Sequence, residues 1–266
     1  MKVLRNITGG PLTSSRLATS RLIQAVIRQF YPFGSIRTVH RGLLKGLRYK
    51  VAPDMGFTYA WGMIEQWDFS DLVRPGMCVY DIGANCGQST LILAKLVGAS
   101  GRVVAFEPVA KNFAILVSNI CLNPSLCVTP VCAAASERNG PLDFLFDSNL
   151  PTQGRLSHVD PSKTLPKAET ISVRGIRLDE YILENWPAPQ FLKIDVEGGA
   201  GAVLRGARSL IAHHRPTIYL DLHGPEEQEV ARELLSAFRY VAHTPSGLEV
   251  PDPTAVWFYT LICKPR

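Results

Sequence analysis

The sequence predicts an α/β fold in which a mostly parallel sheet carries helices on both faces, preceded by a helix and a hairpin. Short apolar segments alternate with helical patterns from residue 77 onward, and the first of these segments runs into a glycine turn. The composition agrees, because 46% hydrophobic and 19% charged residues suit a globular chain and exclude a disordered or fibrous one. No apolar stretch reaches the roughly 18–20 residues that cross a bilayer.

The chain length of 266 residues suits one large domain with an appendage. We expect a basic N-terminal segment over residues 1–55 and a main domain over residues 56–266. In the first, residues 14–30 have the apolar spacing of an amphipathic helix, and residues 36–51 alternate like a hairpin interrupted by glycines. Residues 56–73 are expected to be helical, up to a turn signal.

The net charge of +5 is distributed unevenly along the chain. Residues 1–53 contain ten Lys or Arg and no acid, whereas the remainder contains 18 basic and 23 acidic residues. Such a segment could contact an anionic membrane surface, an anionic glycan or RNA, or it could be a transit peptide. It could equally be the solvated face of a helix. Peripheral membrane contact through this segment is therefore one expected interaction.

The main domain is predicted to alternate strands and helices. The expected strands are 77–82, 102–106, 128–133, 142–146, 169–174, 191–194, 217–222 and 256–262, and the expected helices are 88–97, 111–122, one from about residue 201, and 226–238. Strands 142–146 and 169–174 resemble an antiparallel pair, and the last strand is expected at an edge of the sheet. The intervening loop at 147–168 is either a lid that recognises an acceptor or an ordinary surface loop.

The strongest local signal is the strand and glycine turn over residues 79–87. Gly83 and Gly87 have no Cβ, so the backbone can turn sharply and a ligand can approach closely. The first amides of the following helix favour a carboxylate or another anion. Asn85 stands where a dinucleotide-binding motif has its second glycine. A single ligand that carries a carboxylate therefore fits this loop better than a dinucleotide.

The second strand ends in an acid, Glu107, which lies 26 positions after Asp81. An acid at this place can accept hydrogen bonds from both hydroxyls of a ribose. The simpler alternative is that Glu107 only caps the next helix. The residues expected to bind a cofactor are Asp81, Gly83, Asn85, Gly87, Glu107 and Ser136.

Three motifs together resemble the FkbM-type methyltransferase family. They are Asp81-Ile82-Gly83-Ala84-Asn85-Cys86-Gly87, Phe106-Glu107-Pro108 and Lys193-Ile194-Asp195-Val196-Glu197-Gly198. The resemblance implies a class I, Rossmann-like fold that binds S-adenosylmethionine and usually methylates hydroxyls of sugars or polyketides. The chain departs from the family at Ala200, where members usually carry Glu, and at Asp221-Leu222-His223, where the strand commonly ends with Glu. Both departures lie nearer to the substrate side than to the cofactor side.

The ends of two later strands carry the candidate catalytic residues. Ligands of open α/β sheets bind beyond the carboxyl ends of the strands, and Lys193, Asp195 and Glu197 end one strand while Asp221 and His223 end the next. We expect His223 or Asp195 to be the general base of O-methyl transfer, with Glu197 and Lys193 shaping the site.

Structural roles are open for the same residues. An ion-pair cluster could simply brace the two strands, and His223 could bond only to backbone. The acids and the histidine could also hold a divalent metal, although no ligand spacing requires one.

The function expected from these observations is methylation, dependent on S-adenosylmethionine, of a hydroxyl on a sugar, a glycan or a small natural product. One alternative is RNA methylation, suggested by the basic segment, but no interleaving of aromatic and basic residues supports a nucleic-acid partner. Another is a protein that binds S-adenosylmethionine without turnover, suggested by Ala200. Without CxxC pairs or zinc spacing, Cys78, Cys121, Cys127 and Cys132 are expected to be core residues in the reducing cytoplasm.

Overall fold

The computed structural model describes residues 29–52, 69–146, 155–156, 169–184, 187–255 and 260–266. The chain divides into two compact units, Met1–Gln66 and Trp67–Arg266. Because this boundary lies among residues outside the described ranges, the expected division after residue 55 stays a prediction. Most of the helices expected over 14–30 and 56–73 also lies outside the description. Residues 29–30 are helical, whereas residues 69–73 form a turn and were wrongly assigned to the second helix.

The first unit contains the expected hairpin. Its strands β1 (Ile36–Thr38) and β2 (Arg48–Lys50) pair antiparallel. The connection returns through Gly42 and Gly46, whose φ angles of 72° and 88° are ones that glycine adopts without strain. The alternating pattern of the sequence therefore predicted this element correctly.

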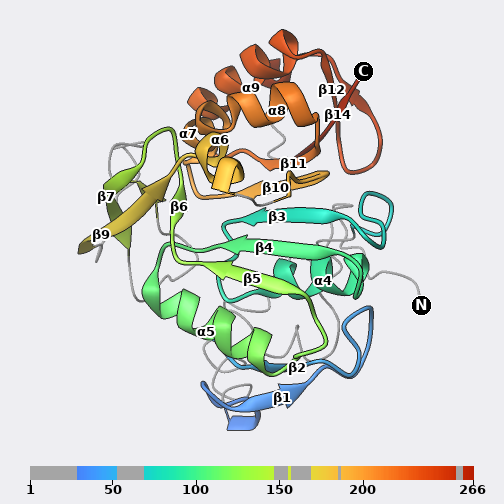
Figure 1. Ribbon diagram of the computed structural model, residues 1–266, viewed down its shortest axis with the longest axis vertical. Helices are drawn as coiled ribbons and strands as arrows, with labels where there is room; N and C mark the ends of the chain where they lie inside the picture. The colour runs from blue at the N-terminus through green and yellow to red at the C-terminus, as the bar shows by residue number, and fades with distance from the viewer. Residues whose placement is uncertain (1–28, 53–68, 147–154, 157–168, 185–186, 256–259) are drawn as a thin grey trace, which may run out of the picture. The chain divides into compact units, whose positions relative to one another are not determined.

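The second unit is built on an eight-stranded sheet with the order β13-β12-β14-β11-β10-β3-β4-β5 (Figure 1). The strands are β3 (Cys78–Ile82), β4 (Arg102–Phe106), β5 (Val128–Val131), β10 (Phe191–Asp195), β11 (Thr217–Asp221), β12 (Tyr240–His243), β13 (Glu249–Val250) and β14 (Thr260–Pro265). The five strands from β11 to β5 run parallel, and β14 is antiparallel to both of its neighbours. The chain order reverses between β3 and β10, which is where open α/β sheets bind ligands.

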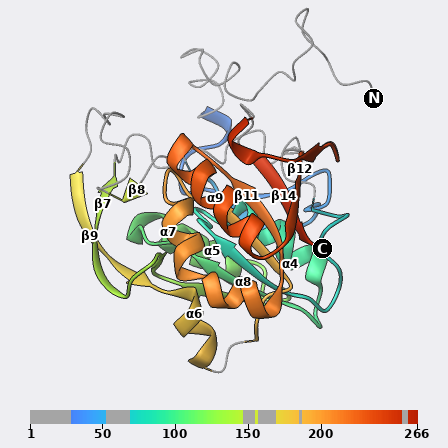
Figure 2. The same ribbon diagram turned by 90° about the horizontal axis from the view of Figure 1, so that it is seen from above.

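Helices cover both faces of this sheet, which confirms the predicted fold class (Figure 2). One face carries α4 (Gln88–Val97) and α5 (Ala110–Cys121), and the other carries α7 (Ala200–Gly206), α8 (Arg208–His214) and α9 (Pro225–Ala237). Right-handed crossovers in opposite directions from the central strands produce this arrangement. The described part of the second unit also contains the short helix α6 (Leu178–Tyr181) and 3-10 segments at Ile182–Glu184 and Pro253–Ala255.

A second sheet of four strands has the order β6-β9-β7-β8. It consists of β6 (Ala134–Ala135), β7 (Gly140–Phe146), β8 (Arg155–Leu156) and β9 (Glu169–Ile176). The antiparallel pairing of β7 with β9 was predicted. Strand β8 lies inside the segment expected to be a loop, whose other residues are outside the description, so the role expected for that loop stays a prediction.

The last strand is not at an edge of the sheet, contrary to our expectation. Strand β14 lies between β11 and β12 and pairs antiparallel with both. The error arose because β12 was not predicted, so the final strand was assigned to the rim. After β11 the chain forms β12 one strand position further out, and β14 later occupies the position between β11 and β12.

The expectation of four buried cysteines was half wrong. Cys78 is buried and Cys127 is half-buried, but Cys121 and Cys132 are exposed. Cys121 is the last residue of α5, and Cys132 follows β5, which is the edge strand of the sheet. Apolar neighbours in the sequence therefore did not indicate burial at these two positions. All six cysteines are free thiols.

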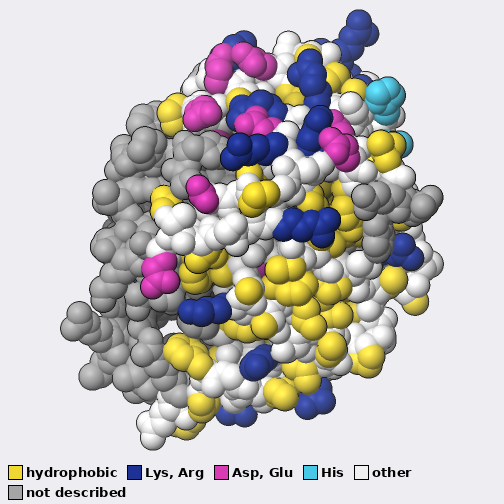
Figure 3. Space-filling view, turned by 60° about the vertical axis from the view of Figure 1, so that its left-hand side comes forward, with side chains coloured by type: hydrophobic (Ala, Val, Ile, Leu, Met, Phe, Trp, Pro, Cys, Tyr) yellow, Lys and Arg dark blue, Asp and Glu magenta, His cyan; other side chains and the backbone are white. Residues whose placement is uncertain are grey.

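The main hydrophobic core joins strand residues such as Tyr80 and Ile194 to helix residues such as Leu204, Leu210 and Leu234. Successive strand side chains alternate between faces, so each central strand contributes to the packing on both sides. On the face of the molecule drawn in Figure 3, apolar side chains are interspersed with Lys and Arg side chains. Among the residues that the structure describes, no helix is both long and apolar enough to cross a membrane.

Candidate active site

A buried ion-pair cluster lies at the centre of the sheet. Lys193 of β10 and Asp81 of β3 are register partners, so their side chains share one face of the sheet. The Lys193 ammonium lies 3.1 Å from Asp81 Oδ1 and 3.3 Å from Asp195 Oδ2. Burial disfavours the charge of Lys193, but the two carboxylates outweigh it and hold the pKa of Lys193 above its ordinary value. Lys193 therefore stays charged and joins the ends of both strands.

The other oxygen of Asp81 fixes the start of α4. Ser89 Oγ and Thr90 Oγ1 donate hydrogen bonds to Asp81 Oδ2 at 2.8 Å and 2.7 Å. Both hydroxyls belong to the first turn of the helix. The sequence analysis missed these residues, although two hydroxyl side chains directly after a glycine turn are a usable signal.

The expected cofactor loop has a left-handed backbone at three positions. The φ angles are 81° at Gly83, 50° at Asn85 and 95° at Gly87. A Cβ on Gly83 would lie 2.0 Å from the carbonyl oxygen of Asp195. Position 83 therefore requires glycine mainly because the end of β10 approaches its backbone closely. The same approach places the loop against the end of β10.

Glu107 is buried and holds two loops together. Its Oε2 accepts the Asn85 N–H and its Oε1 accepts the Val109 N–H, both at 2.9 Å. Burial raises the pKa of Glu107 to about 7, although these hydrogen bonds and one from the Asn112 side chain oppose the rise. A carboxylate oxygen accepts more than one hydrogen bond. Glu107 can therefore cap α5 locally and still accept hydroxyl groups of a ligand.

Ser136 lies beside helix α7. The Ser136 N–H donates to the Ile176 carbonyl at 2.8 Å. A Cβ on Gly206 would lie 1.9 Å from the carbonyl oxygen of Ser136. The backbone of Ser136 thus packs against the end of α7. Its expected contact with a cofactor stays a prediction.

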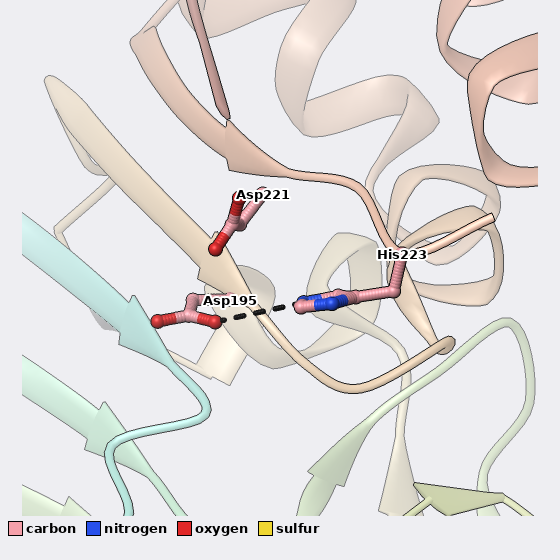
Figure 4. A group of neighbouring side chains, drawn as sticks. All are labelled: Asp195, Asp221 and His223. Atoms are coloured by element: carbon pink, nitrogen blue, oxygen red, sulfur yellow. Dashed lines mark ion pairs between the residues drawn. The ribbon is translucent and has the colours of Figure 1, made fainter. Parts of the chain in front are cut away.

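The structure brings the expected catalytic residues together at the carboxyl ends of β10 and β11 (Figure 4). Asp195 and Asp221 are register partners, and His223 follows two residues after Asp221. His223 Nε2 lies 3.9 Å from Asp195 Oδ1, and His223 Nδ1 lies 3.6 Å from Glu197 Oε2. The Thr260 hydroxyl, from β14, donates to Asp221 Oδ1 at 2.8 Å.

The charges of this cluster support one another. Burial alone would lower the pKa of His223, but the nearby Asp195 carboxylate and the charges of Glu197 and Asp221 raise it to about 9. Burial would raise the pKa of Asp195, but Lys193 and His223 lower it to about 2. His223 is therefore protonated at neutral pH in the protein alone, and Asp195 is a weak base there.

Glu227 ties the two strand-end loops to each other. This buried residue lies in the first turn of α9, and its Oε1 accepts the Ala200 N–H at 2.6 Å while its Oε2 accepts the His223 N–H at 2.5 Å. Ala200 belongs to the hydrophobic core, so the carboxylate at the start of α7 comes from α9. Sequence reasoning missed Glu227, because only the fold brings it to both amides.

The same cluster contains the group of residues best suited to a divalent metal. Among the residues that the structure describes, ligand atoms of Asp195, Asp221 and His223 lie within 4.8 Å of one another. Carboxylates and imidazole are suitable ligands. However, the Lys193 ammonium and the protonated His223 already offset part of the negative charge of Asp81, Asp195, Glu197 and Asp221. The geometry therefore permits a metal but does not require one.

The order of the strands reverses between β3 and β10, and strand β14 is antiparallel to its neighbours. A glycine loop follows β3 and an acid follows β4. Together these features define a class I methyltransferase. Residues 81–244 match the model of the methyltransferase FkbM domain. The chain therefore belongs to the FkbM methyltransferase family, and it is a methyltransferase dependent on S-adenosylmethionine.

Individual proteins are also similar to this chain. The ribosomal RNA large subunit methyltransferase E of Acidithiobacillus ferrooxidans (strain ATCC 53993 / BNL-5-31) is 28% identical over 174 residues, which cover 64% of this chain and 71% of that protein. The crystal structure of methyltransferase FkbM from Methylobacillus flagellatus KT gives a TM-score of 0.50 at 19% identity, covering 78% of this chain. The match spans only 50% of that longer chain. A putative rRNA methylase from Clostridium thermocellum gives a TM-score of 0.45 at 14% identity, covering 74% of this chain and 90% of that one.

The residues of the cofactor side fit S-adenosylmethionine. Glu107 keeps acceptor capacity for ribose hydroxyls, and Gly87 leaves the first amides of α4 without a side-chain cap, which suits a carboxylate. The carboxylates of Asp81 and Asp195 lie at the same end of the sheet, where negative charge suits a cation. When bound, S-adenosylmethionine supplies an electrophilic methyl group on a positively charged sulfur.

Removing the buried ammonium should destabilise the fold. We expect Lys193→Met to lower the free energy of unfolding by about 3–5 kcal/mol, because it leaves buried carboxylates without their partner. Urea denaturation at pH 7 measures this loss. Lys264→Met, on an exposed position of β14, should change the value by less than about 0.5 kcal/mol. Adding Asp81→Asn to Lys193→Met should recover part of the loss. A Lys193→Met protein as stable as the wild type would contradict this role.

The Glu227 carboxylate should contribute stability through its two backbone hydrogen bonds. Glu227→Gln replaces one acceptor by a donor that faces an N–H, so we expect a loss of about 1–3 kcal/mol in the free energy of unfolding. The exposed Glu233, on the same helix, provides the control variant Glu233→Gln. Equal effects of the two substitutions would show that Glu227 does not hold the loops together.

Glu107 should contribute directly to cofactor affinity. We expect Glu107→Ala to weaken binding of S-adenosylmethionine and of its demethylated product by about 1.5–3 kcal/mol, because a charged hydrogen-bond acceptor is lost. Calorimetric titration measures both ligands, and circular dichroism checks the fold of the variant. Glu233→Ala should bind like the wild type. Unchanged affinity in a folded Glu107→Ala protein would remove Glu107 from the site.

Proposed function

We propose that this methyltransferase transfers a methyl group to a hydroxyl of a sugar, a glycan or a small natural product. The observation that carries the proposal is the position of Asp195. Its backbone carbonyl packs against Gly83 of the glycine loop, and its carboxylate faces His223. Asp195 therefore links the loop expected to hold the cofactor to His223, the candidate base. An aliphatic hydroxyl is a poor nucleophile, so it needs both positioning and a proton acceptor.

The proposed roles follow from the contacts of each side chain. Neutral His223 takes the proton of the acceptor hydroxyl at one ring nitrogen, and Asp195 and Glu197 orient the ring. Lys193 keeps Asp195 ionised and in place. A cation bound beside Asp195 would lower the pKa of His223 by like-charge repulsion, which would favour the neutral imidazole at the moment of transfer.

The direct test is a screen of hydroxylated glycans and small natural products with isotopically labelled S-adenosylmethionine. We expect label in an acceptor, with the methyl carbon bonded to oxygen when the product is analysed by NMR spectroscopy. A methyl group on nitrogen or carbon would contradict O-methylation. Binding of the cofactor without transfer to any acceptor would favour a protein that has lost turnover.

RNA methylation is the second candidate. Two observations favour it: the similarity to a ribosomal RNA methyltransferase and the ten basic residues of the first 53. The same labelled cofactor, incubated with total RNA, distinguishes this candidate from the first. RNA methylation would replace the first proposal if the label is found in RNA, is released by nuclease digestion, and is absent from the glycans.

The proposed base gives a specific pH dependence. His223 must be unprotonated to accept a proton, and with a pKa of about 9 in the free protein only about 1% of it is unprotonated at pH 7. We expect kcat/KM for S-adenosylmethionine, which reports the free protein, to rise about tenfold per pH unit up to about pH 9 and then to level off. His223→Gln should abolish this rise. NMR titration of the His223 ring, assigned with that variant, gives the same pKa without any acceptor, and a value near 6.5 would contradict the charge cluster.

We expect turnover without a divalent metal. The carboxylates of Asp195 and Asp221 already face positive charge from Lys193 and His223, so a metal ion has no necessary role there. Turnover should be the same after extensive dialysis against a chelator and after addition of Mg²⁺. Loss of turnover in the chelator, restored by Mg²⁺, would instead assign Asp195, Asp221 and His223 as ligands.

A further inference from the structure

The segment over residues 29–52 combines exposed apolar side chains with cations. Among the described residues, six large hydrophobic side chains are exposed, and four of them lie in this short segment: Phe30, Phe33, Ile36 and Leu43. The segment also contains five Lys or Arg and no acid. Single exposed apolar side chains are common on protein surfaces, but four of the six described ones lie within this one short segment, which indicates a surface that contacts something else. Methyl transfer does not explain this surface.

The hairpin places both kinds of side chain on one face. Ile36 lies opposite Lys50, and Thr38 lies opposite Arg48, so these four side chains point to the same side of the two strands. Tyr49 points to the other side and is buried. The exposed face of the hairpin is therefore a mixture of apolar and cationic groups.

The connection between the strands continues this composition. Leu43 is exposed in the turn, and Arg41 and Lys45 beside it are exposed as well. Phe30 and Phe33 precede β1 and are both at least half exposed, at 64% and 50%. We call the set Phe30, Phe33, Ile36, Arg41, Leu43 and Lys45 the hairpin surface.

We propose that the hairpin surface binds the interface of an anionic lipid bilayer. Apolar side chains would enter the boundary between headgroups and acyl chains, and the cations would lie at the level of the lipid phosphates. Ile36 and Leu43 cannot stack on the bases of RNA, and the cations alone would suffice to bind RNA or an anionic glycan, so neither ligand uses these two exposed aliphatic side chains. A second copy of the chain would bring like charges together. A bilayer uses both the charge and the apolar groups, and the proposal does not depend on the methyl acceptor.

The test is co-sedimentation of the full chain with vesicles. Vesicles of equal parts phosphatidylserine and phosphatidylcholine should bind the protein, vesicles of phosphatidylcholine alone should bind it weakly, and high salt should release it. The pair Arg41→Ser and Lys45→Ser should weaken binding by about fivefold for each cation removed. The pair Phe30→Ser and Phe33→Ser should weaken binding and leave its salt dependence unchanged.

The control pair is Leu183→Ser and Leu248→Ser, because these are the other two exposed large hydrophobic residues. This pair should bind vesicles like the wild type. Titration with S-adenosylmethionine checks that each variant is folded. The proposal is overturned by vesicle binding that neither hairpin pair affects, by equal binding to both vesicle types, or by wild-type protein that binds RNA or an anionic glycan but no vesicles. A concentration-dependent dimer that both hairpin pairs dissociate, without vesicle binding, would assign the surface to a second copy.

Discussion

The buried ammonium of Lys193 is the interaction on which the site depends. It lies between Asp81, which fixes the start of α4 through Ser89 and Thr90, and Asp195, which faces His223. Each carboxylate would be costly to bury alone, and the lysine would be costly without them. One side chain therefore connects the expected cofactor loop with the proposed acceptor side of the sheet. A displacement of either strand end would change the charge balance of both.

The candidate acid-base group is a consequence of this balance. Lys193 keeps Asp195 ionised, Asp195 and Glu197 hold a proton on His223, and Glu227 fixes the backbone of His223 through its N–H. The histidine is thus strongly positioned but rests in its charged form. In the proposed mechanism, cofactor binding, rather than the protein alone, would control when the base is available. Such a dependence would limit proton removal to the complex in which a methyl group is present.

The sequence predicted most of the parts that depend on local signals. Strand β4 and helix α4 have the predicted bounds, because an apolar run, a glycine turn and a helical spacing lie next to one another along the chain. The residues at the ends of β10 and β11 were predicted for the same reason, since parallel strands bring their carboxyl ends together. Glu227 and the place of β14 were not predicted. Both depend on contacts between distant segments, which no local pattern reveals.

The position of β14 has a consequence for how the chain folds during synthesis. Strands β11 and β12 leave the ribosome first, yet they are not neighbours in the finished sheet. Until β14 arrives, each has an unpaired edge that could join the other in the wrong register. The three strands beyond β11 can therefore join the sheet only when residues 260–265 have emerged and inserted between strands already made. The Asp221 carboxylate gains its Thr260 partner in that same event, so this part of the candidate site is complete only after residues 260–265 have been synthesised.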